Sequence, residues 1–82
     1  MVKVILITAK ACPACPFAKQ VWSDLRKEHN FEYEEVDAMS EKGKKLVQKF
    51  FIEAVPTTII DDKIAFIGVP DKNKARKMVR GG

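Results

Sequence analysis

The sequence predicts one α/β domain over residues 1–82, with the element order β-α-β-α-β-β-α. Three observations predict it. The run from Val2 to Thr8 is almost continuously aliphatic, which is typical of a central strand buried on both faces. A helical repeat follows the cysteines, and two short apolar runs near the C-terminus are close enough to form a hairpin. A chain of 82 residues that is 46% hydrophobic can bury one core.

The first helix is predicted from the second cysteine to about His29 and Asn30, where Asn suits a C-terminal cap. Its apolar residues recur at helical spacing and should form one buried stripe: Phe17, Ala18, Val21, Trp22 and Leu25.

The next strand, 31–37, carries three glutamates. Such charge is typical of the edge of a sheet, where it discourages further pairing. Ser40 can cap a second helix, although Gly43 should weaken its start. The apolar face of this second helix is predicted to consist of Leu46, Val47, Phe50 and Phe51.

Pro56 opens the β-branched run 57–60, and the turn 61–63 leads into the apolar run 64–67. Two adjacent strands joined so closely indicate an antiparallel hairpin, which Gly68 and Pro70 end. A last helix is predicted over 71–80, with Gly81 past its end. Three of its residues should face inward: Ala75, Met78 and Val79.

Charge and hydropathy narrow the classes of partner. The formal net charge is +4, but the lysines and arginines are spread among acidic residues and no aromatic residues interleave with the basic clusters. This pattern favours solvated helix faces over nucleic-acid binding. No apolar stretch approaches the ~20 residues that span a bilayer, and the apolar run near the N-terminus is shorter than that of a signal peptide. We therefore expect a cytoplasmic, monomeric protein without a nucleic-acid or membrane partner.

Cys12-Pro13-Ala14-Cys15 contains both cysteines of the chain. Cysteines with this spacing occur in redox sites and in halves of zinc sites. One chain offers only His29 as a further zinc ligand, so a closed zinc site needs two chains. The residues favour the redox interpretation, with no metal, and leave a zinc-bridged dimeric binding module as the alternative from another class.

The predicted helix start explains why this spacing suits redox chemistry. Unpaired N–H groups and the macrodipole at a helix N-terminus favour a thiolate. Cys12, at the mouth of the helix, should be the more exposed and acidic thiol, and Cys15 the more shielded one. Lys10 is a candidate for adding a positive charge nearby.

These features together resemble the thioredoxin and glutaredoxin family over essentially the whole chain. The likeness rests on the element order, on the Cys-Pro-x-Cys segment after the first strand, and on Val55-Pro56-Thr57 before the hairpin. It is closest to the short, glutaredoxin-sized thioredoxins. The resemblance implies a minimal thioredoxin fold with a four-stranded mixed sheet, flanked by three helices. The implied strand order is 31–37, 2–8, 57–60 and 64–67.

The resemblance also implies a dithiol–disulfide oxidoreductase, an electron carrier of cell redox homeostasis. Cys12 would attack a disulfide of a protein substrate and Cys15 would resolve the mixed disulfide, with no cofactor beyond this redox-active pair. The Val55–Pro56 bond would be cis and face the dithiol. The substrate would pair with the backbone beside it, with Gly68 leaving room at the same surface.

The resemblance does not fix the electron donor. A thioredoxin-reductase-like enzyme or glutathione would restore the dithiol. A glutathione-dependent glutaredoxin is the nearer alternative function, although Gly68-Val69-Pro70-Asp71 keeps only one glycine and an aspartate of the segment that binds glutathione in glutaredoxins.

Overall fold

A computed structural model describes residues 1–80 of the chain. Within this range no helix has both the length and the apolar character needed to cross a membrane. The elements follow the predicted order: β1 (Lys3–Thr8), α1 (Cys15–Glu28), β2 (Glu32–Asp37), α2 (Glu41–Phe50), β3 (Thr57–Ile60), β4 (Lys63–Ile67) and α3 (Lys72–Arg80).

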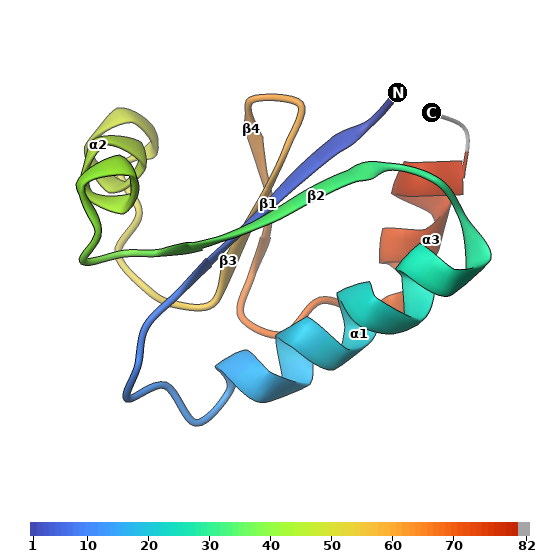
Figure 1. Cartoon of the computed structure of the whole chain (residues 1–82), viewed down its shortest axis with the longest axis horizontal. Helices are drawn as coiled ribbons and strands as arrows, with labels where there is room; N and C mark the ends of the chain where they lie inside the picture. The colour runs from blue at the N-terminus through green and yellow to red at the C-terminus, as the bar shows by residue number, and fades with distance from the viewer. Residues whose placement is uncertain (81–82) are drawn as a thin grey trace.

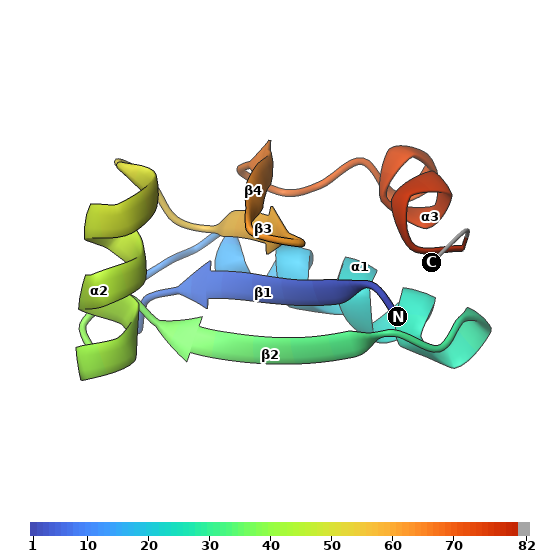
Figure 2. The same ribbon diagram turned by 90° about the horizontal axis from the view of Figure 1, so that it is seen from above.

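The four strands form one mixed sheet in the order β2-β1-β3-β4, as the resemblance implied. β1 pairs in parallel with β2 and antiparallel with β3, and β4 pairs antiparallel with β3. Figures 1 and 2 show β1 inside the sheet with helices on both sides. The aliphatic run therefore forms a central strand, and the glutamate-bearing strand lies at an edge.

One face of the sheet is covered by α1 and α3. Trp22 of α1 is fully buried at the centre of this core, and its indole N–H donates to Thr58 Oγ1 of β3 at 3.2 Å. Its ring meets Phe31 edge-on at 5.9 Å between centroids. The stripe of α1 is thus fixed by packing and by one buried polar contact.

Among the described residues, α2 alone covers the other face, and its start depends on Ser40 and Gly43. Ser40 Oγ accepts the N–H of Gly43 at 3.0 Å, so the predicted cap is confirmed. A side chain on Gly43 would overlap the carbonyl oxygen of Asp37 at the end of β2. Gly43 therefore lets α2 approach the sheet. The low helix propensity of glycine alone does not indicate this role.

Three side chains that the periodicity placed in the core are exposed instead. Phe17 is 66% exposed, because the buried stripe of α1 runs through Ala18 and Trp22 and leaves Phe17 on its flank. Met78 is 44% exposed beside the buried Val79. The third is Phe51, because α2 ends at Phe50 and Phe51 is its left-handed cap, 84% exposed.

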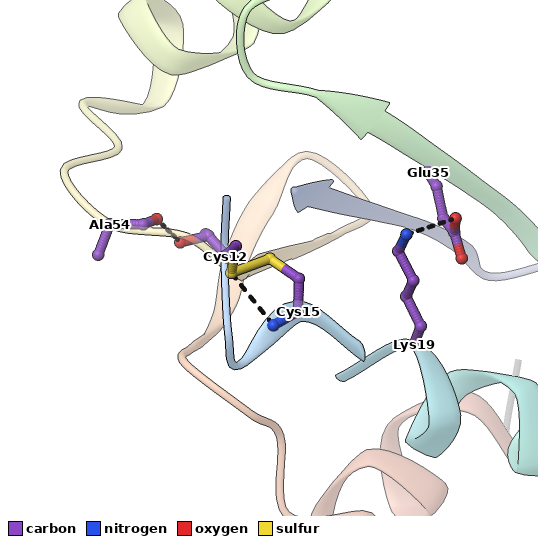
Figure 3. The surroundings of a disulfide bond; sticks show 6 residues. Cys12, Cys15, Lys19, Glu35 and Ala54 are labelled. Carbon is purple, nitrogen blue, oxygen red and sulfur yellow. Dashed lines mark hydrogen bonds and ion pairs between the residues drawn. A yellow bond between two sulfur atoms is a disulfide. The ribbon is translucent and has the colours of Figure 1, made fainter. Parts of the chain in front are cut away.

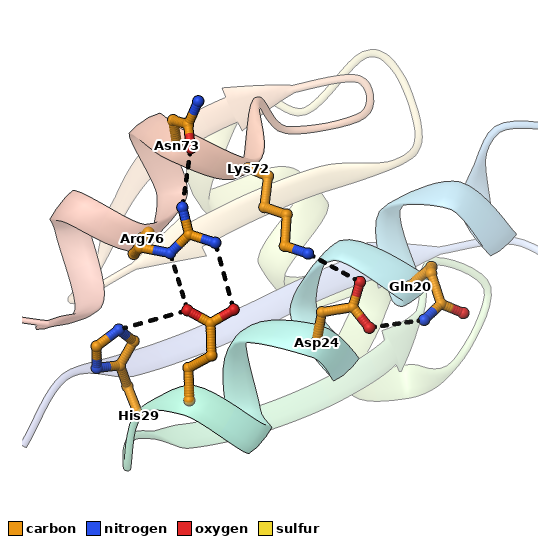
Figure 4. A network of polar contacts seen from close by, with 7 residues as sticks. Gln20, Asp24, His29, Lys72, Asn73 and Arg76 are labelled. Atoms are coloured by element: carbon orange, nitrogen blue, oxygen red, sulfur yellow. Dashed lines mark hydrogen bonds and ion pairs between the residues drawn. The ribbon is translucent and has the colours of Figure 1, made fainter.

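Two ion pairs on the surface connect α3 to α1. Lys72 binds Asp24 at 3.1 Å, and Arg76 binds Glu28 at 2.9 Å (Figure 4). Asp71 caps α3, because its Oδ1 accepts the N–H of Lys74 at 2.9 Å. The predicted position of Gly81 lies outside the described residues.

Candidate active site

The two cysteines lie where the loop after β1 enters α1, and a disulfide joins them (Figure 3). Cys12 is partly exposed in the turn before the helix, whereas Cys15, the first residue of α1, is only 3% exposed. The structure thus agrees with the predicted difference in access: Cys12 is partly exposed and Cys15 is shielded.

The backbone at the start of α1 points toward the outer sulfur. The N–H of Cys15 donates to Cys12 Sγ at 3.1 Å (Figure 3). Pro16, in the first turn, has no N–H to leave unpaired, and this turn contains no acidic residue. An N–H donor and the positive end of the helix dipole, with no nearby carboxylate on the helix, favour a negative charge on Cys12.

A proline loop lies at the same end of the sheet. The Val55–Pro56 peptide bond is cis, and Thr57 pairs with Ile7 near the end of β1, from which the cysteine loop departs. The hydroxyl of Thr57 donates to the carbonyl of Ala54 at 2.6 Å (Figure 3). A hydrogen bond within the proline loop therefore stabilises its conformation.

Gly68 is joined directly to this loop, since its N–H donates to the Pro56 carbonyl at 2.8 Å. Its φ is +90°, a conformation that favours glycine, and a Cβ here would meet no atom within 4 Å. The positive φ therefore explains why glycine occupies position 68. The open space beside it is compatible with the predicted approach of a substrate.

The cysteine pair, the proline loop and Gly68 lie at one end of the sheet, whereas Lys10 makes no hydrogen bond or ion pair within residues 1–80. Lys10 is exposed in the turn two residues before Cys12. Its predicted influence on the thiol depends on proximity along the chain alone.

Sequence reasoning missed an exposed ion pair between α1 and β2, one helical turn beyond Cys15. Lys19 Nζ lies 3.8 Å from a carboxylate oxygen of Glu35, as Figure 3 shows. Tyr33 donates its hydroxyl to Glu35 at 2.8 Å, and burial with this contact raises the pKa of Tyr33 well above its ordinary range. Lys19 follows Cys15 by one helical turn, which was the available signal.

No metal centre is formed by the described part of the chain, residues 1–80. There, no three histidine, cysteine, aspartate or glutamate side chains are grouped closely enough to hold an ion.

Comparison with known proteins agrees with this geometry. A family model described as a thioredoxin domain matches residues 1–80. A probable thioredoxin from Archaeoglobus fulgidus is 36% identical over 80 residues, covering 98% of this chain and 88% of the relative. A thioredoxin from Methanocaldococcus jannaschii is 37% identical over 73 residues, covering 87% and 84% of the two chains.

Solved structures show the same fold at lower sequence identity. An uncharacterised thioredoxin-like protein from Clostridium perfringens superposes with a TM-score of 0.81 at 24% identity, over 99% of this chain and 70% of the other. A mutant thioredoxin from Halobacterium salinarum gives 0.78 at 17% identity, over 98% and 73%. These two likenesses speak for the fold alone.

Proposed function

This chain belongs to the thioredoxin family of disulfide oxidoreductases, and from that premise we propose that it reduces disulfides in protein substrates through Cys12 and Cys15. The observation that carries the proposal is the unequal access of the two linked cysteines at the mouth of α1. A pair of this kind can take a substrate on the outer sulfur and release it from the inner one.

The first step belongs to Cys12. In the reduced protein its thiolate attacks one sulfur of a substrate disulfide. An S–S bond forms between Cys12 and the substrate, the substrate S–S bond breaks, and the second substrate sulfur leaves as a thiolate that takes up a proton. The N–H of Cys15 supports this step, because it donates to the Cys12 sulfur.

Cys15 completes the reaction. Its thiol loses a proton and attacks the Cys12 sulfur, the mixed disulfide breaks, and the second substrate thiol is released. Two electrons and two protons have then passed to the substrate, and the Cys12–Cys15 disulfide is the oxidised product. The pair itself carries the electrons, so we propose no other cofactor.

The proline loop is proposed to hold the substrate backbone. Within residues 1–80, the amide and carbonyl of Val55 make no backbone hydrogen bond, so both are available to an extended segment. The rest of the substrate-binding surface would be formed by Pro56, Thr57 and Gly68. The hydrogen bond from the Gly68 N–H to the Pro56 carbonyl supports this grouping. Lys10 is proposed to favour the thiolate through its positive charge.

We further propose that the chain works as a single monomeric domain in the cytoplasm, because continual disulfide reduction requires a reducing compartment. A thioredoxin-reductase-like enzyme is the proposed donor and glutathione the alternative. The family match and the relatives named thioredoxin support the former.

Reduction of insulin disulfides tests the proposed function and the donor together. The oxidised protein is supplied either with NADPH and a thioredoxin reductase or with glutathione, glutathione reductase and NADPH. We expect insulin reduction in the first system, and Cys12→Ser should abolish it. Recycling by glutathione alone would establish the alternative. A control uses the chemically reduced protein in an amount stoichiometric with insulin. If this protein does not reduce insulin disulfides, the proposal is contradicted whichever donor is used.

A further inference from the structure

The two faces of the sheet are covered unequally. Within residues 1–80, α1 and α3 pack on one face and α2 alone packs on the other, as Figure 1 shows. On the α2 face, β4 is left without a helix above it. Ile64 is 40% exposed and Ile67 is 72% exposed there, although both belong to a strand of the sheet.

These isoleucines line a depression of about 190 Å³ together with Phe51, and we call it the β4 groove. A second, separate depression of about 210 Å³ is lined by Ile5 and Ile59. Because Ile59 pairs with Ile64 across the β3–β4 ladder, the second depression adjoins the strand that carries the groove.

Phe51 gives the groove an aromatic lip. It caps α2 with φ 54° and ψ 45°, the left-handed conformation that normally favours glycine, and its side chain is 84% exposed. A bulky residue in this conformation destabilises the fold, and its exposed ring offsets little of that cost because it is not buried in the core. The ring is thus better placed to contact another molecule than to stabilise this one.

Carboxylates border the β4 groove, although the chain as a whole has a net charge of +4. Glu53 lines the groove beside Phe51. Asp61 and Asp62 lie in the turn that leads into β4, and they line the second depression together with Lys3. The groove therefore suits an apolar surface bordered by positive charges.

The same charges argue against a second copy of this chain. A two-fold dimer through this surface would bring the same patch of both copies together, with carboxylate against carboxylate. An added strand is also disfavoured. The β3–β4 ladder has an irregularity at Thr58 and Ile59, and Lys63 lies in β4; both features discourage pairing at an edge.

We propose that the β4 groove docks an amphipathic helix of a partner protein. Its apolar stripe would lie on Ile64 and Ile67, and its lysines or arginines would face Glu53, Asp61 and Asp62. The five residues of β4 extend ~17 Å, the length of roughly three helical turns. The groove also includes Thr57, next to Pro56, so a helix docked here would bring its protein to the cysteine end of the sheet.

The proposal is tested with the full chain and two synthetic peptides of about four turns. The probe carries a leucine stripe flanked by lysines, and its partner has glutamate in place of every lysine. Backbone amide NMR of the oxidised protein should show saturable shifts at residues of the β4 groove with the lysine peptide. The glutamate peptide should bind at least tenfold more weakly.

Variants distinguish peptide binding at the β4 groove from nonspecific binding. Ile64→Ser with Ile67→Ser should weaken binding at least tenfold, whereas Met78→Ser, which removes an exposed side chain from α3, should leave it unchanged. Asp62→Asn, a surface change that keeps the fold even if the double variant does not, should weaken binding severalfold. Because this readout uses no redox reaction, it does not depend on the proposed function.

Three results would overturn the proposal. The first is a set of shifts centred away from the β4 groove. The second is equal binding of the two peptides, or binding that the groove variants do not change. The third is a dimer seen by sedimentation without peptide and removed by Ile67→Lys, which would make a second copy the occupant.

Discussion

At the scale of single residues, the chemistry depends on one hydrogen bond and one helix end. The N–H of Cys15 reaches Cys12 Sγ at 3.1 Å, and the first turn of α1 lacks an acidic side chain. The hydrogen bond favours negative charge on Cys12, whereas burial at the start of the helix disfavours it on Cys15. The two thiols should therefore differ in acidity as well as in access.

The acidity difference is measurable in the reduced protein. We expect the Cys12 thiol to titrate well below the ~8.5 of a free cysteine, because the helix end and the N–H favour its thiolate. Ultraviolet absorbance of the thiolate follows the titration, and Cys12→Ser should remove the low transition. A Cys12 midpoint at or above that of a free cysteine would contradict this prediction.

The residue scale also shows what periodicity cannot supply. The cysteine pair, the cap at Ser40 and the proline before β3 were predictable because each has a local physical signature. The exposure of Phe17 and Phe51 was not. Whether an apolar residue at the flank or end of a helix is covered depends on which elements pack there, and helical spacing does not contain that information.

At the scale of elements, the close approach of α2 to β2 is the feature that local propensity misjudged. Gly43 lies where any Cβ would overlap the Asp37 carbonyl oxygen. Ser40 Oγ both donates to that carbonyl and accepts from Gly43 N–H, so cap, glycine and strand end form one joint. The joint positions α2, whose apolar face completes the second core around Ile7 and Val36.

This joint predicts the effect of Gly43→Ala. In an exposed helix the change would stabilise by about 1 kcal/mol. Here we expect a loss of about 1–3 kcal/mol, as for an overpacked core site, because α2 must move away from β2. Urea denaturation followed by Trp22 fluorescence measures it. Lys44→Ala, on the exposed side of the same helix, is the matched control and should change stability little; an unchanged or higher stability of Gly43→Ala would disprove the joint.

At the scale of the whole molecule, contacts between residues far apart in sequence connect the last helix to α1, the helix that begins at Cys15. Arg76 reaches Glu28, and Lys72 reaches Asp24, 48 residues away in each case. The Arg76 guanidinium lowers the pKa of Glu28, and Lys72 with Gln20 lowers the pKa of Asp24. The relative order of these elements was predictable, but this pairing depends on tertiary packing.

The lowered pKa values fix the sign of a pH effect on stability. A carboxylate whose pKa falls on folding adds stability above its unfolded pKa and loses it as the pH falls through the folded value. Between about pH 7 and about pH 3, wild type should lose more unfolding free energy than Asp24→Asn with Glu28→Gln. The difference should be small and should shrink in high salt, because these groups are exposed. If the unfolding free energy of wild type and of the variant fell equally with pH in low-salt buffer, this role of the ion pairs would be contradicted.

The central claim is that the outer sulfur attacks and the inner sulfur releases, and the reduced Cys15→Ser variant tests it most directly. Mixed with a protein disulfide substrate, it should accumulate a one-to-one mixed disulfide on Cys12, detected by mass spectrometry and removed by dithiothreitol. Cys12→Ser under the same conditions should form little adduct, because Cys15 is only 3% exposed. Full catalytic turnover by Cys15→Ser, or an equal adduct on Cys15 of the Cys12→Ser variant, would contradict the account.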